Sequence, residues 1–135
     1  MADINDYYSV LEGLRNEIEQ TKALTSEEKD MIMSCGYGHI SEGDIQISLG
    51  VKKDDYEVAT NVRERAASVA DQFLVDYVTS RKGSISGEHG VGCQRVNALQ
   101  KSKGEAFVRT MHTLKDAFDP NGILNPGKVL PPKEK

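Results

Sequence analysis

Residues 44–51 have the sequence Asp-Ile-Gln-Ile-Ser-Leu-Gly-Val, in which large apolar residues occupy every second position. Successive side chains of a β-strand point to opposite faces, so strict alternation predicts a strand with one buried face. The two predicted faces are Ile45, Ile47, Leu49 and Val51 on the buried side, and Asp44, Gln46, Ser48 and Gly50 on the other. The segment therefore predicts one strand of a small sheet.

A partner strand is expected immediately before it. Met31, Ile32, Met33 and Cys35 form an apolar run that leads into a bend at Gly36 and Gly38, which is typical of a buried strand. Ser41-Glu42-Gly43 then predicts the hairpin connection. The preceding residues, Thr25 to Asp30, are expected to form a polar connector.

Apolar residues spaced by three and four predict a helix on each side of the hairpin. The first begins near Asn5 or Asp6, and the second runs from about Asp55 to Thr79 and packs on the hairpin. The expected inner face of the first helix is Tyr7, Val10, Leu11, Leu14 and Ile18. That of the second is Val58, Val62, Ala66, Val69, Ala70, Phe73, Tyr77 and Val78.

Two short helices are expected near the C-terminus. Ser102-Lys103-Gly104-Glu105 matches a capping box at the start of the last one, which Asp119-Pro120 ends, with a turn at Asn121-Gly122. Its predicted inner face is Phe107, Met111, Leu114 and Phe118. Helices on one face of a small antiparallel sheet make an α+β fold.

Length and composition favour one compact domain. The 135 residues are 38% hydrophobic and 28% charged, enough to bury one core. The domain is expected to span residues 1–130, and Pro131 to Lys135 to be a disordered tail.

Charge and hydropathy narrow the possible functions. The net charge of −4, the pI near 5.4 and the scattered basic residues argue against nucleic-acid binding. The apolar runs are far shorter than the ~20 residues of a membrane span, and the N-terminus lacks the pattern of a signal or transit peptide. Cys35 and Cys93 lack CxxC spacing, so both are expected to be buried or idle thiols in a reducing compartment.

The stretch Ser84-Ile85-Ser86-Gly87-Glu88-His89-Gly90-Val91-Gly92 carries the clearest chemistry. It sets a carboxylate beside an imidazole in a loop whose glycines allow positive φ, which suits a metal ligand next to a general base. Taken alone, the same stretch also fits a surface turn with solvated side chains. Two further segments favour a site.

These segments are Gly36-Tyr37-Gly38-His39-Ile40-Ser41-Glu42-Gly43-Asp44-Ile45-Gln46-Ile47 and Phe118-Asp119-Pro120-Asn121-Gly122-Ile123-Leu124-Asn125-Pro126-Gly127-Lys128. In this order, with the Glu88-His89 loop between them, they resemble the C-terminal domain of FAD-linked oxidases. The similarity is greatest to the D-2-hydroxyglutarate and D-lactate dehydrogenase branch, whose patterns are GHxGDGNLH, S-x-EHG-x-G and DPxGILNPxK. The resemblance covers about Tyr7 to Leu130 and implies a ferredoxin-like cap domain.

The resemblance also implies a missing partner. Related enzymes hold FAD mainly in a separate N-terminal domain of roughly 200 residues, which this chain cannot contain. No glycine-rich turn links a predicted strand to a helix with an acidic residue about 20 positions further on. FAD binding is therefore expected only with a flavin-binding partner chain or upstream domain, and the chain alone is expected to be inactive.

Family resemblance implies a divalent metal, usually zinc, held by two histidines and a glutamate. The first histidine matches His39 and the glutamate matches Glu88, but the second histidine position holds Gln46. An amide oxygen is a poor zinc ligand, so metal binding is expected to be weakened. Asp44 could supply an oxygen instead, although a solvated strand carboxylate is the favoured interpretation.

His89 matches the family histidine that takes the α-hydroxyl proton of a D-2-hydroxy acid while hydride leaves for the flavin. Asn125 matches the tail residue that lies against the flavin ring, and Lys128 is expected to approach the same pocket. His112, off the apolar stripe of the last helix, is interpreted as an ordinary exposed histidine.

Two functional interpretations remain. One is the substrate and metal domain of an FAD-dependent D-2-hydroxy acid dehydrogenase of D-lactate or D-2-hydroxyglutarate type. The other is a non-catalytic protein-binding homologue, because some eukaryotic relatives have been named actin-interacting proteins. The resemblance implies a mitochondrial location, and the absence of a targeting pattern favours the cytoplasm.

Overall fold

The computed structural model describes residues 4–133 and divides the chain into two compact units, Met1–Tyr77 and Val78–Lys135. Unit 1 contains the hairpin, in which β1 (Ile32–Tyr37) pairs antiparallel with β2 (Gln46–Val51). The register sets Ile32 opposite Val51 and Tyr37 opposite Gln46. The predicted hairpin is thus confirmed.

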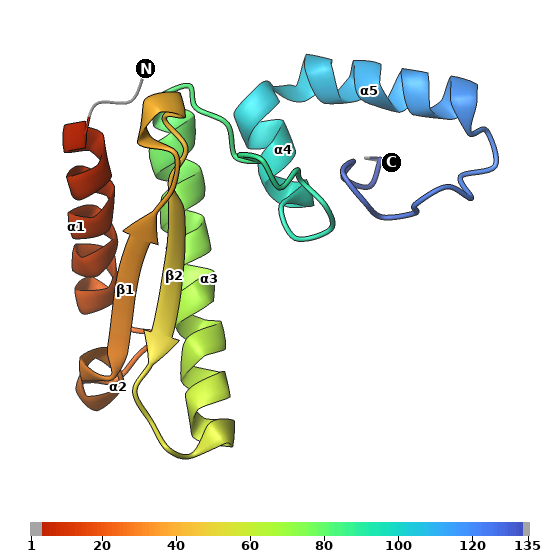
Figure 1. Cartoon of the computed structure of the whole chain (residues 1–135). Helices are drawn as coiled ribbons and strands as arrows, with labels where there is room; N and C mark the ends of the chain where they lie inside the picture. The colour runs from red at the N-terminus through yellow and green to blue at the C-terminus, as the bar shows by residue number, and fades with distance from the viewer. Residues whose placement is uncertain (1–3, 134–135) are drawn as a thin grey trace. The chain divides into compact units, whose positions relative to one another are not determined.

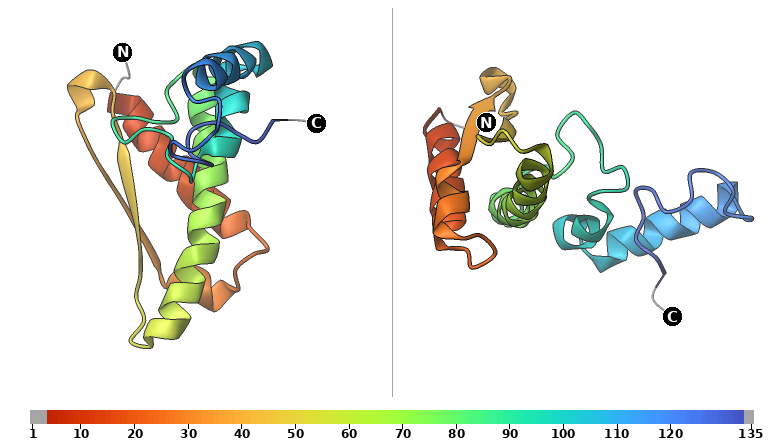
Figure 2. Two further views of the ribbon diagram at one scale, coloured as in Figure 1. Left: turned by 90° about the vertical axis from the view of Figure 1, so that its right-hand side faces the viewer. Right: turned by 90° about the horizontal axis from the view of Figure 1, so that it is seen from below.

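Two helices cover one face of this hairpin, α1 (Ile4–Gln20) and α3 (Tyr56–Ser80) (Figure 1). Seen from the side, the strands lie on one side of unit 1 and both helices lie on the other (Figure 2). The buried core cluster is Leu14, Ile18, Leu24, Val62, Ala66 and Ala70, with Ile32, Ile47, Leu49 and Val51 packed against it. The α+β class and the helices on one face of an antiparallel sheet are confirmed.

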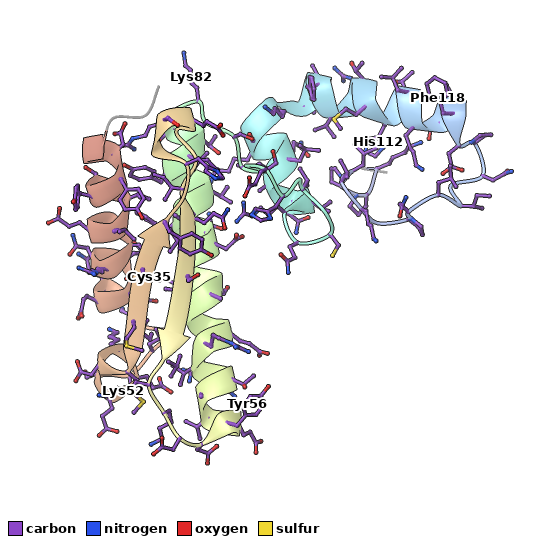
Figure 3. All side chains as sticks on the ribbon, viewed as in Figure 1. Cys35, Lys52, Tyr56, Lys82, His112 and Phe118 are labelled. Carbon is purple, nitrogen blue, oxygen red and sulfur yellow. The ribbon has the colours of Figure 1, made fainter. Side chains whose placement is uncertain are left out.

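Only one face of β1 is covered, which corrects the prediction of a buried strand. Burial alternates along β1, and the side chain of Met33 is 56% exposed. Cys35 on the same outer face is also exposed, as is Cys93 in unit 2, so neither thiol is buried (Figure 3). Burial alternates along this strand although the apolar residues do not, because Ser34 and Gly36 occupy inner positions of the strand.

A short helix, α2 (Ser26–Asp30), replaces the predicted polar connector. Thr25 caps it through its side chain, which accepts the Glu28 amide, while the Glu28 carboxylate accepts the Thr25 amide. The sequence Thr25-Ser26-Glu27-Glu28 has the Thr-x-x-Glu pattern of a capping box. Periodicity missed the helix because five polar residues carry no apolar stripe.

Glu28 also joins α2 to α3. Both of its carboxylate oxygens accept hydrogen bonds from the Arg65 guanidinium, at 2.5 and 3.1 Å. The same guanidinium donates to the Ala23 carbonyl at 2.8 Å. The hydrogen bond from Arg65, followed by that from the Thr25 amide, lowers the pKa of Glu28 from 4.5 to about 2.

In unit 2, a loop leads into α4 (Val96–Lys103) and α5 (Glu105–Phe118), and residues 119–133 form a tail without regular secondary structure. The expected capping box at Ser102 to Glu105 is wrong. Ser102 lies inside α4, and Gly104, with φ +84°, ends that helix by donating its amide to the Gln100 carbonyl. Gly104 also precedes α5 without a side-chain cap. In the part of the chain that the structure describes, no helix is both long and apolar enough to cross a membrane.

The expected inner face of α5 is also corrected. Phe107, Leu114 and Phe118 are 52%, 55% and 84% exposed, and the buried residue of α5 is Val108. The apolar stripe exists as the sequence indicates, but unit 2 leaves most of it uncovered.

Asp119 fastens the tail to the end of α5. Its carboxylate is 6% exposed and accepts three hydrogen bonds, from Lys115 Nζ and from the amides of Ile123 and Leu124. Lys115 Nζ also donates to the Leu124 carbonyl at 2.7 Å. The predicted helix stop and the turn at Gly122 are confirmed. Farther along, Lys133 bonds Asp116 at 2.5 Å, and the other expected tail residues Glu134 and Lys135 lie outside the described residues.

We expect the Glu28–Arg65 ion pair to make the thermal stability of the chain sensitive to acid. Because folding lowers the pKa of Glu28, the stabilisation is complete above pH 4.5 and is lost as the pH falls toward about 2. Glu28→Gln should therefore lower the unfolding temperature at neutral pH and change it much less near pH 2. The matched control is Glu27→Gln, an exposed neighbour on α2. Equal losses for both variants at neutral pH would contradict the assignment.

We expect Asp119→Asn to loosen the tail. The Lys115 hydrogen bond, followed by the Leu124 amide, lowers the pKa of Asp119, so its partners favour the charged carboxylate. The neutral amide should accept these bonds more weakly, and the amides of Ile123 and Leu124 should exchange with solvent several-fold faster. Hydrogen–deuterium exchange measures this, with Glu105→Gln as control, because Glu105 is an exposed acidic residue of the same helix whose ion pair is with Arg109. Unchanged exchange in Asp119→Asn would show that the clamp does not hold the tail.

Candidate functional site

Backbone geometry shapes the loop that carries Glu88 and His89. The Ser86 carbonyl accepts the amides of His89 at 3.0 Å and Gly90 at 3.1 Å, which closes a turn. Gly90 and Gly92 have φ of +77° and +56°, and a Cβ at either position would meet no atom within 4 Å. These glycines are therefore required by backbone conformation and not by packing.

The turn presents the two side chains together. His89 Nε2 lies 3.7 Å from Glu88 Oε1, and the side chains are 70% and 50% exposed, respectively. The imidazole can accept a proton, and the carboxylate can hold a cation or stabilise a charged imidazole. Both groups are open to solvent, so a reaction here requires a partner or a ligand to exclude water.

The tail lies against this loop within unit 2. The Val129 amide donates to the Gly92 carbonyl at 2.7 Å, three residues after His89. Just before Val129, the Lys128 amide bonds the Asn125 carbonyl at 3.3 Å, and Asn125 has a φ of +46°. The structure therefore brings the Asn125 to Lys128 segment to the loop that carries His89.

A second loop, between β1 and β2 in unit 1, carries His39. The His39 carbonyl accepts the amides of Glu42 at 2.9 Å and Asp44 at 3.2 Å. A Cβ at Gly38 would lie 2.3 Å from the Asp44 carbonyl oxygen, so only glycine fits there. The predicted strand began at Asp44, but these contacts keep Asp44 in the loop, and β2 begins at Gln46.

The structure gives Asp44 a different position from the one that the sequence predicts. A nitrogen of the His39 imidazole and a carboxylate oxygen of Asp44 lie within 4.8 Å of each other. Asp44 is half-buried, and its Oδ2 is buried without a hydrogen-bond partner among the described residues. A buried carboxylate oxygen without a donor is costly unless a cation or proton satisfies it. The expected strand position of Asp44 is therefore wrong, and its Oδ2 is not solvated.

The other predicted ligands are distributed over both units. Gln46 is half-buried at the start of β2, opposite Tyr37, in the same unit as His39. Glu88 belongs to unit 2. The structure thus places His39 near Asp44 within unit 1, and the combination of His39, Gln46 and Glu88 in one metal site stays a prediction.

His39 and Asp44 in unit 1 offer two of the four ligands that a tetrahedral zinc site requires. An imidazole nitrogen and a carboxylate oxygen are both common zinc ligands, and two ligands of one tetrahedral zinc lie roughly 3.5 Å apart. His39 is exposed and can turn toward the buried Asp44 oxygen. Such a pair still needs further ligands to complete the coordination.

Two further residues differ from the sequence interpretation. His112, expected to be exposed, is half-buried on α5 (Figure 3). Asp119 was interpreted only as a helix stop, although it positions the tail. The side chain of an aspartate directly after a helix can accept hydrogen bonds from the amides that follow it. The sequence Asp-Pro-Asn-Gly at residues 119–122 is typical of such a turn.

The turn that leads from β2 to α3 differs from the glycine-rich turn of a Rossmann-type dinucleotide site. Here β2 leads to α3 through Lys52-Lys53-Asp54-Asp55, which contains no glycine and two carboxylates. Asp55 uses its side chain to cap α3 by accepting the amides of Glu57 and Val58.

Comparisons with known proteins place these features in a family. Residues 2–129 match the family described as FAD linked oxidases, C-terminal domain. The chain is 31% identical over 127 residues to the D-2-hydroxyglutarate–pyruvate transhydrogenase of Saccharomyces cerevisiae, covering 94% of this chain and 24% of that protein. It is 32% identical to the D-2-hydroxyglutarate dehydrogenase of Stutzerimonas stutzeri, over 84% of this chain and 24% of that protein.

A third relative is a putative mitochondrial D-lactate dehydrogenase of Schizosaccharomyces pombe, 32% identical over 76% of this chain and 18% of that protein. The chain thus spans about a quarter or less of the length of these relatives. The family match includes both units and all the segments that carry His39, Glu88, His89 and Lys128. The chain belongs to the FAD-linked oxidase C-terminal domain family.

Proposed function

We propose that this chain is the substrate and metal portion of an FAD-dependent D-2-hydroxy acid dehydrogenase of D-2-hydroxyglutarate or D-lactate type. The hydrogen bond from Val129 to Gly92 is the observation that carries the proposal. It holds together the two segments to which the resemblance assigns proton removal and flavin contact.

His89 is the proposed general base. It removes the proton of the substrate α-hydroxyl as the neighbouring carbon is oxidised to a ketone, and the imidazole becomes positively charged. The Glu88 carboxylate, whose Oε1 lies 3.7 Å from His89 Nε2, stabilises this positive charge when the carboxylate is not bound to a metal. A flavin, supplied by the flavin-binding partner chain or domain, would accept the hydride from that carbon.

The charge of unit 2 favours an anionic substrate. Residues 78–135 contain 10 Lys and Arg residues and 5 Asp and Glu residues, which gives unit 2 a formal charge of +5. Residues 1–77 contain 7 Lys and Arg residues and 16 Asp and Glu residues, which gives unit 1 a formal charge of −9. These values add to the −4 of the whole chain. A cationic unit raises the local concentration of carboxylates, which suits hydroxy acids.

The proposed metal site uses His39 and Asp44 in addition to Glu88, with Gln46 as a weak ligand. The buried Asp44 oxygen without a donor supports this assignment. A bound divalent ion would orient the hydroxyl and carboxylate of the substrate. Asp44 thereby compensates in part for the imidazole that Gln46 replaces.

The alternative is a non-catalytic protein-binding homologue, such as an actin-interacting protein. Gln46 favours it, because an amide stands where the resemblance requires an imidazole ligand. The uncovered apolar residues of α5 are also suited to protein binding. Activity in the presence of the flavin-binding portion decides between the two.

For location, the Schizosaccharomyces pombe relative and the Arabidopsis thaliana D-2-hydroxyglutarate dehydrogenase are both named as mitochondrial. We propose the same compartment for this chain on that resemblance.

We expect the chain alone to bind no FAD and to oxidise neither D-lactate nor D-2-hydroxyglutarate. A fusion that replaces the matching C-terminal quarter of the Saccharomyces cerevisiae relative with this chain should oxidise one of them. His89→Ala should then lower kcat by about 100- to 10,000-fold, the contribution of a positioned base, with little change in substrate binding.

Dye reduction measures these rates, and the control is His112→Ala, which alters a histidine outside the proposed site. An FAD-loaded fusion without turnover would refute the dehydrogenase proposal and favour the protein-binding alternative. Equal rates for His89→Ala and the unmodified fusion would remove His89 from its role.

We expect zinc to bind the chain weakly and to depend on Asp44. Asp44→Asn should lower the affinity by roughly tenfold or more, and Gln46→His should raise it, because an imidazole is a better zinc ligand than an amide. Titration calorimetry with zinc alone gives both values. Ser48→Ala, at an exposed position of β2, is the control. Unchanged affinity in both variants would show that these residues do not share a metal.

A further inference from the structure

Arg95 lies between the loop that carries His89 and the first turn of α4. Its guanidinium donates a hydrogen bond to the carbonyl of Ile85, ten residues earlier in the chain. Its backbone amide donates to the Val91 carbonyl at 3.3 Å. One residue therefore bonds the main chain on both sides of Glu88 and His89, at three residues before the first and two residues after the second.

The residues on either side of these hydrogen bonds are held in place. The side chain of Ile85 is buried, with 3% of its surface exposed. At the other end, Val96 and Leu99 of α4 are also buried, and the Arg95 carbonyl accepts the amide of Ala98 at 3.0 Å. Arg95 thus connects the loop to a helix that is itself fixed by burial.

The segment from Ser86 to Gly92 depends on hydrogen bonds for its order. Three of its seven residues are glycines, which have the greatest backbone freedom. The side chains of Glu88 and His89 are 50% and 70% exposed, so packing does not fix them. The position of the imidazole is therefore set by the main chain of the loop and by the bonds that restrain it.

Arginine is well suited to restraining this loop. Its guanidinium is planar, carries five N–H donors and stays charged at every pH at which a histidine titrates. A hydrogen bond from a charged donor is roughly twice as strong as one between neutral groups. Arg95 is half-buried, so water competes less for its donors than it does at an exposed side chain.

We propose that Arg95 is a positioning residue, which holds the loop so that the His89 imidazole stands where the substrate proton leaves. The inference rests on the proposed function, in which His89 is the general base. Reacting atoms must lie about 3–3.5 Å apart, and a displacement of ~1 Å can lower the rate roughly 100-fold. Arg95 bonds the main chain of the loop, so it affects the rate by setting the position of His89.

Hydrogen–deuterium exchange in the isolated chain tests whether Arg95 orders the loop. Arg95→Met keeps an apolar stem and removes the guanidinium donors. The amides of His89 and Gly90, which bond the Ser86 carbonyl, should then exchange several-fold faster. The Val108 amide, which bonds the Gly104 carbonyl at the start of α5, should keep its exchange rate.

Arg109→Met is the matched control. Arg109 is an exposed arginine of the same unit whose ion pair is with Glu105, so its loss removes one positive charge and should leave the exchange of the loop unchanged. Unchanged exchange at His89 in the Arg95→Met chain would overturn the proposal. Faster exchange at both His89 and Val108 would overturn it as well, because Arg95 would then support unit 2 as a whole.

Kinetics test the consequence for the base, in the FAD-loaded fusion of this chain with the flavin-binding portion of the Saccharomyces cerevisiae relative. Arg95→Met should lower kcat roughly 10- to 100-fold and leave KM within about twofold, because a displaced base impairs proton removal more than substrate binding. Arg95→Lys keeps a charged donor and should recover several-fold of the lost rate. Arg109→Met should change neither constant.

The outcomes separate this inference from the proposed function. An unmodified FAD-loaded fusion without turnover refutes the dehydrogenase function, and the role of Arg95 in catalysis with it. Turnover with an unchanged kcat in Arg95→Met refutes the role of Arg95 alone. A raised KM with an unchanged kcat would assign Arg95 to substrate binding, and equal losses in Arg95→Lys and Arg95→Met would remove the charged donor from the explanation. Both results overturn the positioning role.

Discussion

The burial of one hairpin face under two helices is the constraint on which unit 1 depends. A two-stranded sheet is at best marginally stable in water by itself. Leu14 and Val62, the largest fully buried side chains, come from the two helices and pack with the inner residues of both strands. Because β1 and β2 are held in one register, the loop between them closes at a defined place, and His39 and Asp44 come together there.

Unit 2 buries the apolar side chains of Ile85, Val96, Leu99 and Val108, and polar contacts at a few points hold its loop and tail. The Asp119 carboxylate gathers the tail at the end of α5, and the bond from Val129 to Gly92 returns the chain to the Glu88-His89 turn. Arg95 adds a further tie by donating to the Ile85 carbonyl at the base of that turn. These contacts arrange functional groups beside a surface that remains apolar and uncovered.

The sequence proposes the residues of the candidate site, and their roles stay predictions. The family patterns pointed to His39, Glu88, His89, Asn125 and Lys128, and the structure joins Val129, the residue after Lys128, to Gly92 in the His89 loop. Asp44 was undervalued because its alternation with Ile45 and Gln46 suggested a strand. The backbone bond from Asp44 to the His39 carbonyl, and the close approach at Gly38, pull it into the loop instead. Such contacts have no periodic signature in a sequence.

The sequence by itself determined the elements with a strong period: the hairpin, α1 and α3, whose apolar residues have one favourable way to leave water. It also determined the family, through three motifs in a fixed order. Only the tertiary structure decided which apolar stripes are covered. The stripes of α1 and α5 look alike as patterns, but Leu14 is buried and Phe118 is 84% exposed. An apolar stripe indicates that one face of a helix is suited to burial, but the stripe does not indicate which partner covers that face.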